Sequence, residues 1–133
     1  MPPITLCAKF DLFPDGTVLG TSFNHSGFTF SAKGLTALFV NNTSGEKGIR
    51  IPPPGITVEL IAPSNHATFR VGIWDGKPIT VTAKDVNGVT VSTKVITGHN
   101  QYIDSFINGR SIKYLDFDVT GHEEMLISVC INI

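Results

Sequence analysis

The stretch from Ile73 to Ile96 constrains the fold of this chain more than any other, because it contains two alternating runs joined by a turn dipeptide. Asn87-Gly88 separates the runs, and Asn-Gly in that position is the strongest short-range signal for a β-hairpin. A type I′ turn needs positive φ at both central residues, which Asn and Gly tolerate best. Asp75-Gly76 predicts a second tight turn at the entry of the hairpin. We therefore expect two antiparallel strands here.

The alternation within the hairpin predicts which side chains face the core. We expect apolar side chains on the inner face, namely Ile79, Val81 and Ala83 in the first strand and Val89, Val91 and Val95 in the second. The opposite face carries Thr, Ser and Lys side chains. Such a pattern is typical of an antiparallel sheet that is apolar inside and solvated outside.

The rest of the chain continues the same pattern. Further strands are expected at residues 4–10, 28–30, 35–41, 56–62, 67–73, 102–107, 114–119 and 125–133. Ile49-Arg50-Ile51 leads into the following prolines. Residues 17–27 are expected to be a long irregular connection and residues 42–48 a polar loop, while Pro63-Ser64-Asn65 and Asn108-Gly109 predict turns. Pro52-Pro53-Pro54 is rigid and cannot donate ladder hydrogen bonds. No stretch has a helical period with caps.

Composition supports an all-β domain and excludes several classes of protein. Apolar residues make up 41% of the 133 residues and charged residues 16%, which is incompatible with a disordered chain. The formal net charge of -1 gives no electrostatic footprint for nucleic acid. No apolar run approaches the roughly 20 residues of a membrane span, and the N-terminus has no secretory signal pattern. We expect one antiparallel β-sandwich domain over residues 1–133, of jelly-roll topology. A closed barrel is the alternative, and the irregular spacing of the Pro-rich and Gly-rich breaks disfavours it.

At this level the chain resembles the jelly-roll β-sandwich domains of the galactose-binding-like and carbohydrate-binding-module type. The resemblance lies in the opening Cys7-Ala8-Lys9-Phe10 strand, the Gly76-to-Ala83 hairpin that leads to Asp85-Val86-Asn87-Gly88, and the Gly109-to-Phe117 strand. These motifs are sheet and turn patterns, so they imply a fold more than a function. The resembled domains often end in Ile-Asp-Asn or Ile-Asp-Asp, where this chain reads Leu126-Ile127-Ser128-Val129.

The resemblance implies that the first and last strands are neighbours, which would allow a disulfide between Cys7 and Cys130. The alternative is two separate buried thiols, which behave as small apolar residues. A disulfide would favour an extracellular or cell-surface location; the sequence alone leaves the compartment open.

The resembled fold often carries a structural ion, so Ca²⁺ is a candidate although no cofactor is required. Ca²⁺ needs six to eight oxygens from several segments. Asp11 and Asp116 are the candidate ligands, with Asp15, Glu46 and Asp118 as further acidic side chains. Asp116 and Asp118 equally suit the solvent face of a strand.

Trp74 is the single Trp and falls out of phase with the apolar face of its strand. An exposed ring would suit the C–H face of a sugar, with polar neighbours supplying hydrogen bonds. Companion side chains would be Arg70, Tyr102, Asn100, His66 and Tyr114. The alternative is that Trp74 covers the end of the core beneath a loop.

Three functions are compatible with this reading. The leading hypothesis is a non-catalytic ligand-binding module, lectin-like and specific for carbohydrate. The alternative is a structural, assembly or adhesion module that works through protein–protein contacts, with oligomers as a consequence. A hydrolase would need a cleft with paired carboxylates, and no local motif marks a nucleophile, so we expect no enzyme. The four His residues lack metal-site spacing and are expected at the surface.

Overall fold

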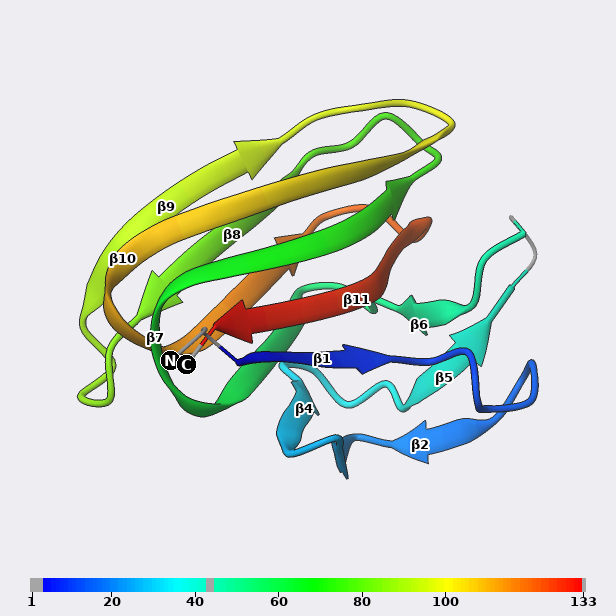
Figure 1. The fold of residues 1–133 in the computed structure, drawn as a ribbon. Coiled ribbons are helices and arrows are strands. Elements are labelled where there is room, and N and C mark those ends of the chain that lie inside the picture. Colours follow the sequence, from blue (N-terminus) through cyan, green and yellow to red (C-terminus); the bar gives the residue numbers. More distant parts are fainter. Residues whose placement is uncertain (1–3, 43–44, 133) are drawn as a thin grey trace.

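The computed structural model describes residues 4–42 and 45–132, and the regular structure within them is entirely β-strand (Figure 1). The strands are β1 (Thr5–Lys9), β2 (Val18–Gly20), β3 (Ser22–His25), β4 (Phe28–Ala32), β5 (Leu38–Asn41), β6 (Gly48–Arg50), β7 (Gly55–Ile73), β8 (Ile79–Lys84), β9 (Thr90–Ile96), β10 (Gln101–Val119) and β11 (Glu124–Asn132). In this described part of the chain, no helix is long and apolar enough to cross a membrane.

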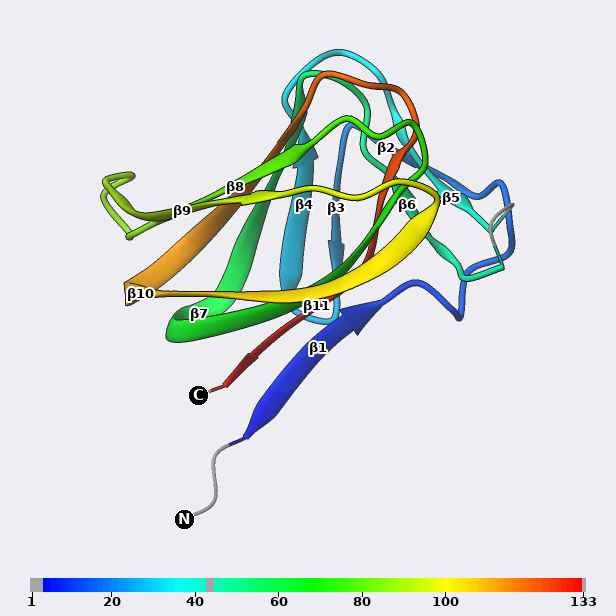
Figure 2. The same ribbon diagram turned by 90° about the horizontal axis from the view of Figure 1, so that it is seen from above.

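The two longest strands, β7 and β10, each run through both layers of a sandwich. Residues 55–60 of β7 and 112–119 of β10 pair in a first layer with β3, β4, β8 and β9. Residues 64–73 of β7 and 101–108 of β10 pair in a second layer with β11, which β1 and β6 extend. Figures 1 and 2 show both long strands curving from one layer into the other. The predicted antiparallel β-sandwich is confirmed.

The bend of these strands lies where the sequence predicts two turns. Pro63-Ser64-Asn65 and Asn108-Gly109 do not end strands, and those two predictions are wrong. The two segments face each other across the ladder, with register shifts between Asn108 and Ile112, and the Ser111 amide donates to Asn65 Oδ1 at 2.9 Å. A strand that changes layer needs an interrupted ladder and unusual backbone angles, so it uses the residue types that turns use.

The core fills the space between the layers, as the alternation predicts. Inward side chains of β7 are almost fully buried: Ile56, Val58 and Leu60 in the first layer, Ala67, Phe69, Val71 and Ile73 in the second. Phe69 meets Phe117 of the opposite layer edge to face, with ring centroids 5.4 Å apart. Residues 17–27 depart from the prediction, because they form β2 and β3 rather than an irregular connection.

The hairpin of β8 and β9 is present, but its turn and its second face differ from the prediction. Gly88 has φ +79° whereas Asn87 does not have positive φ, so the turn is not type I′. Instead Gly88 N donates to Asp85 O at 3.0 Å, and the Asp85 carboxylate accepts from the amides of Asn87 and Val89. This is an aspartate-anchored turn that closes on a left-handed glycine.

A bulge then reverses the faces of β9. Ala83 pairs with Ser92 while Lys84 pairs with Thr90, so Val91 is an extra residue in the ladder. One extra residue moves every following side chain to the other face. Val95 therefore points outward and is 58% exposed. Val89 precedes the bulge and lies at the turn, where it is also 58% exposed, so only Val91 of the three packs partly against the core.

Candidate functional site

The outer surface of the second layer carries most of the polar and aromatic side chains that the sequence singles out. We call it the groove face, and it consists of Lys9, His66, Thr68, Arg70, Gly72, Tyr102, Asp104, Phe106, Asn108 and Ser128. These residues alternate along their strands with the buried ones, which turns them outward. The register places Asp104 and Ser128 on either side of Arg70, and Phe106 beside Thr68.

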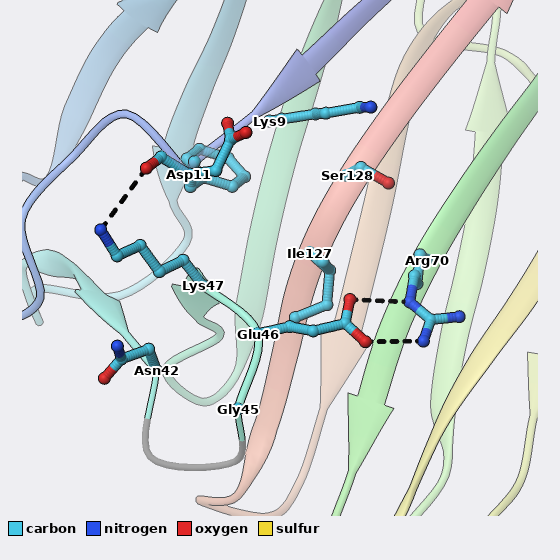
Figure 3. Close-up of a pocket in the computed structure, with 10 residues that line it drawn as sticks. Lys9, Asp11, Asn42, Gly45, Glu46, Lys47, Arg70, Ile127 and Ser128 are labelled. Carbon is cyan, nitrogen blue, oxygen red and sulfur yellow. Dashed lines mark hydrogen bonds and ion pairs between the residues drawn. The ribbon is translucent and has the colours of Figure 1, made fainter.

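Two hollows indent the groove face, and they share Arg70 and Ser128. The first hollow, of about 470 Å³, is shown in Figure 3 and is lined by Lys9, Phe10, Asp11, Asn42, Gly45, Glu46, Lys47, Arg70, Ile127 and Ser128. The second, of about 430 Å³, is lined by His66, Thr68, Phe69, Arg70, Asp104, Ser105, Phe106 and Ser128. Because two lining residues are common, the hollows adjoin and form one groove across β10, β7, β11 and β1.

Arg70 is held rigidly at the junction of the hollows. Its Nε and Nη2 donate to Glu46 Oε1 and Oε2 at 3.0 and 2.7 Å (Figure 3). Its Nη1 donates to Asp104 Oδ2 at 2.9 Å. The hydrogen bonds to Glu46 and Asp104 raise the pKa of Arg70 above its ordinary value. A fork-to-fork pair of this kind fixes geometry as well as charge. The pair also ties the loop before β6 to the sheet.

Tyr102 and Trp74 form the aromatic end of the same face. The guanidinium carbon of Arg70 lies 4.9 Å from the Tyr102 ring centroid, and Trp74 meets Tyr102 edge to face at 5.0 Å. The Glu46 amide donates to the Tyr102 hydroxyl at 2.9 Å. Trp74 lies against Gly72, where a β-carbon would be 2.9 Å from its Cζ2. Trp74 is thus partly covered, and its ring is built into a packed cluster.

Phe106 is an exposed ring in the second hollow that our sequence reasoning did not select. It is 48% exposed, with the Lys94 ammonium 4.1 Å from its ring centroid and His66 5.7 Å away. A signal for it exists, because Phe106 is in phase with the outward Tyr102 and Asp104 rather than with the buried Ile107.

The structure brings together four of the six candidate ligand residues on or beside one face: Trp74, Arg70, Tyr102 and His66. His66 lies at the far end, where its ring nitrogen Nδ1 bonds Asn108 Oδ1. Asn100 stands apart, since it lies in the loop before β10, contacts His99 and lines neither hollow. Tyr114 belongs to the outer surface of the first layer, where it pairs with Lys84.

Asp11 and Asp116 do not form one ligand set for a metal ion. Asp11 lines the first hollow, whereas Asp116 lies on the outer surface of the other layer. Asp116 accepts from Thr57 at 2.6 Å and pairs with Lys84 at 2.7 Å and Lys33 at 3.6 Å. Burial alone would raise the pKa of Asp116, but these bonds and charges hold it below its usual value. Across residues 4–42 and 45–132 no three His, Cys, Asp or Glu side chains gather as a metal site.

Cys7 and Cys130 lie directly opposite each other on β1 and β11 and form a disulfide, with their Cα atoms 4.1 Å apart. They border the groove face next to the Lys9–Ser128 pair. The bridge joins the first and last strands, so it locks the two ends of the described chain to one edge of the second layer.

Comparison by sequence gives no relative: no protein-family model matches the chain, and no curated protein matches it. Comparison of structures does give a fold. A single-residue mutant of a family 29 carbohydrate-binding module is similar with a TM-score of 0.55 at 12% identity, over 97% of this chain and 92% of that one.

Two further solved structures bear on the comparison. A family 6 carbohydrate-binding module from Clostridium stercorarium, in complex with cellobiose, has a TM-score of 0.50 at 12% identity, over 92% of this chain and 89% of that one. A family two carbohydrate esterase from Cellvibrio japonicus has a TM-score of 0.47 at 12% identity, and the chain spans 33% of its length and 98% of its own. The carbohydrate-binding modules show that this chain has their β-sandwich fold. The likeness to the esterase is too weak to carry an argument about activity.

Proposed function

We propose that the protein is a non-catalytic module that binds carbohydrate along the groove face. The observation that carries this proposal is the pair of adjoining hollows with a rigid Arg70 at their junction and the half-exposed Phe106 ring in one of them. The shared fold of carbohydrate-binding modules supports it.

The dimensions and chemistry of the groove suit a sugar chain. Small-molecule sites have volumes of about 300–1,000 Å³, and each hollow falls within this range. An aromatic ring offers an apolar surface for the C–H face of a pyranose. Arg70, Asp104 and Ser128 supply donors and acceptors for hydroxyl groups at the centre. Because the two hollows adjoin, the ligand that fills both is an oligosaccharide rather than one sugar ring.

The charge of the groove favours an uncharged glycan. The acidic and basic side chains that line it balance in number, with Lys9, Lys47 and Arg70 against Asp11, Glu46 and Asp104. Arg70 is already paired with two carboxylates, so it offers its remaining N–H groups without a free charge. The balanced lining gives an acidic sugar no net electrostatic attraction to the groove.

The disulfide supports a place outside the cytosol. Structural disulfides persist in oxidising compartments and are rare in the cytosol. A module that binds insoluble or surface-bound glycan would work in that setting. We therefore propose an extracellular or cell-surface location.

Affinity electrophoresis against neutral and acidic polysaccharides tests the proposal. Phe106→Ala removes the exposed ring, and we expect about a fivefold loss of affinity, since an aromatic contact contributes about 1 kcal/mol. Val86→Ala is the control, because Val86 is 63% exposed and lines neither hollow. If no neutral or acidic glycan retards the protein, or if both variants bind as the parent does, the proposal is wrong.

A second candidate function is assembly with other protein chains, and exposed apolar side chains support it. Leu35 is 98% exposed, Leu12 87% and Val18 70%, all of them outside the core. Light scattering at high concentration distinguishes the two functions. A stable oligomer that Leu35→Ser dissociates would favour assembly, and a monomer at every concentration would exclude self-assembly.

A further inference from the structure

A buried carboxylate and a half-buried one meet at the end of the sandwich, outside both hollows. Glu124 begins β11 and is 0% exposed, and Asp75 lies in the turn after β7. Glu124 Oε2 accepts from the Glu123 amide at 2.8 Å, but Oε1 is buried without a hydrogen-bond partner. Asp75 Oδ1 accepts from the Lys77 amide at 3.0 Å, which leaves Oδ2 for other contacts.

Glu124 Oε1 and Asp75 Oδ2 both point toward Gly121. A β-carbon on this buried glycine would lie 2.5 Å from Glu124 Oε1 and closer still to Asp75 Oδ2. The unpartnered oxygen of Glu124 therefore faces a second carboxylate in a space that the 120–123 loop closes. Two ionised carboxylates in such contact repel each other, and one proton between them removes the repulsion and gives both oxygens a partner.

The environment of Glu124 favours proton uptake. Burial is the main cause that raises the pKa of Glu124 to about 7, the charge of Asp75 adds to it, and the Glu123 amide and Lys77 oppose it. The other ionisable groups on the packed elements are exposed or half-buried side chains: His99, His122, Glu123 and Arg50.

We propose that Asp75 and Glu124 share a single proton, and that this proton clamps the turn at residues 74–77 onto the loop at residues 120–123. Glu124 Oε1–H donates to Asp75 Oδ2 when the site is occupied. On deprotonation the proton goes to solvent and the two carboxylates push the segments apart. A metal ion is a poorer occupant, because no third acidic or His side chain joins the pair among the described residues.

The clamp lies one residue from the groove face. Trp74 donates its amide to Glu123 O at 3.3 Å, and its ring packs against Tyr102, which in turn lies under Arg70. Opening of the clamp would therefore loosen the aromatic end of the groove. This link to ligand binding rests on the proposed function, whereas the proton site itself does not.

Urea unfolding between pH 5 and pH 8 tests the proton site directly. A carboxyl with a raised folded-state pKa stabilises the fold below its unfolded pKa and loses this contribution as pH rises to about 7. We expect the unfolding equilibrium constant of the parent protein to rise roughly 50- to 100-fold over this range. Glu124→Gln carries a permanent donor to Asp75, and it should remove most of the rise. Glu123→Gln, at an exposed neighbouring glutamate, should retain it.

Direct titration keeps the test decisive if a variant fails to fold. NMR of the Glu124 side-chain carboxyl in the parent protein should show a midpoint near pH 7, and Asp75→Asn should move that midpoint to lower pH. A midpoint near the ordinary value for glutamate, or equal pH dependence in the parent and Glu124→Gln, would overturn the proposal. So would Ca²⁺ stabilising the parent but not Glu124→Gln at pH 8, since the site would then hold a metal ion. Glycan affinity is measured separately, and its absence leaves the titration result intact.

Discussion

Removal of the Cys7–Cys130 disulfide should cost this protein much of its stability. The two residues are 123 positions apart, so the bridge closes almost the whole chain into one loop. In the chain-entropy model, a disulfide that closes a loop of this length raises the free energy of the unfolded state, and so stabilises the folded protein, by about 5 kcal/mol. The free energy of unfolding of a small domain is about 5–15 kcal/mol, so loss of the disulfide would remove an amount close to the lower end of that range. For a chain of this size it corresponds to about 15 °C in melting temperature.

The experiment compares guanidinium unfolding of the parent protein, the parent with reductant, and the double variant Cys7→Ser/Cys130→Ser. We expect the reduced parent and the double variant to unfold at similar, lower denaturant concentrations, and reductant to leave the double variant unchanged. A thiol assay on the unfolded, unreduced parent should find no free thiol. A loss of stability below about 1 kcal/mol, or titratable thiols before reduction, would refute the reasoning.

Three further predictions concern the sheet. Val81→Thr should lower the free energy of unfolding by about 1–2 kcal/mol because Val81 is fully buried, whereas Val95→Thr should change it by less than about 0.5 kcal/mol. Equal losses for the two variants in chemical denaturation would contradict the reversed faces of β9. Gly72→Ala should push the single Trp74 aside and shift its fluorescence emission to longer wavelength, and an unchanged spectrum would contradict the contact. Asp116 has a lowered pKa, so it stabilises the fold above the unfolded carboxyl pKa of about 3.9 and loses this contribution as pH falls through its folded pKa. Asp116→Asn should therefore cost about 1–2 kcal/mol at neutral pH and weaken the acid dependence, since its lysine partners are only partly buried.

Side-chain alternation made the layers predictable. Along β7 the apolar residues at every second position are the buried ones, because a strand in a sandwich must turn one face to the core. The same logic failed in β9, where one extra residue at Val91 reversed the faces. Nothing in the sequence marks that bulge. The turn predictions at Pro63-Ser64-Asn65 and Asn108-Gly109 were wrong for a different reason. A strand that interrupts its ladder uses the same residue types as a strand that ends in a turn.

The groove face was predictable only in part. Arg70, Tyr102 and Trp74 are near one another because the register of β7 and β10 sets them side by side. Their partner Glu46 comes from a loop whose position no local pattern determines, and from the sequence alone its carboxylate is a candidate metal ligand. The sequence does not predict the Asp75–Glu124 pair, because the two residues are brought together only where two loops meet at the end of the sandwich.

The central claim is that carbohydrate binds along the groove face, and NMR titration tests it most directly. A ¹⁵N-labelled sample is titrated with neutral oligosaccharides of two to six sugar units, with an acidic oligosaccharide for comparison. We predict amide shift changes centred on Arg70, Phe106 and Ser128, and affinity that rises with chain length until both hollows are filled. Absence of shifts with every neutral oligosaccharide, or shifts confined to the opposite layer around Asp116, would contradict the account.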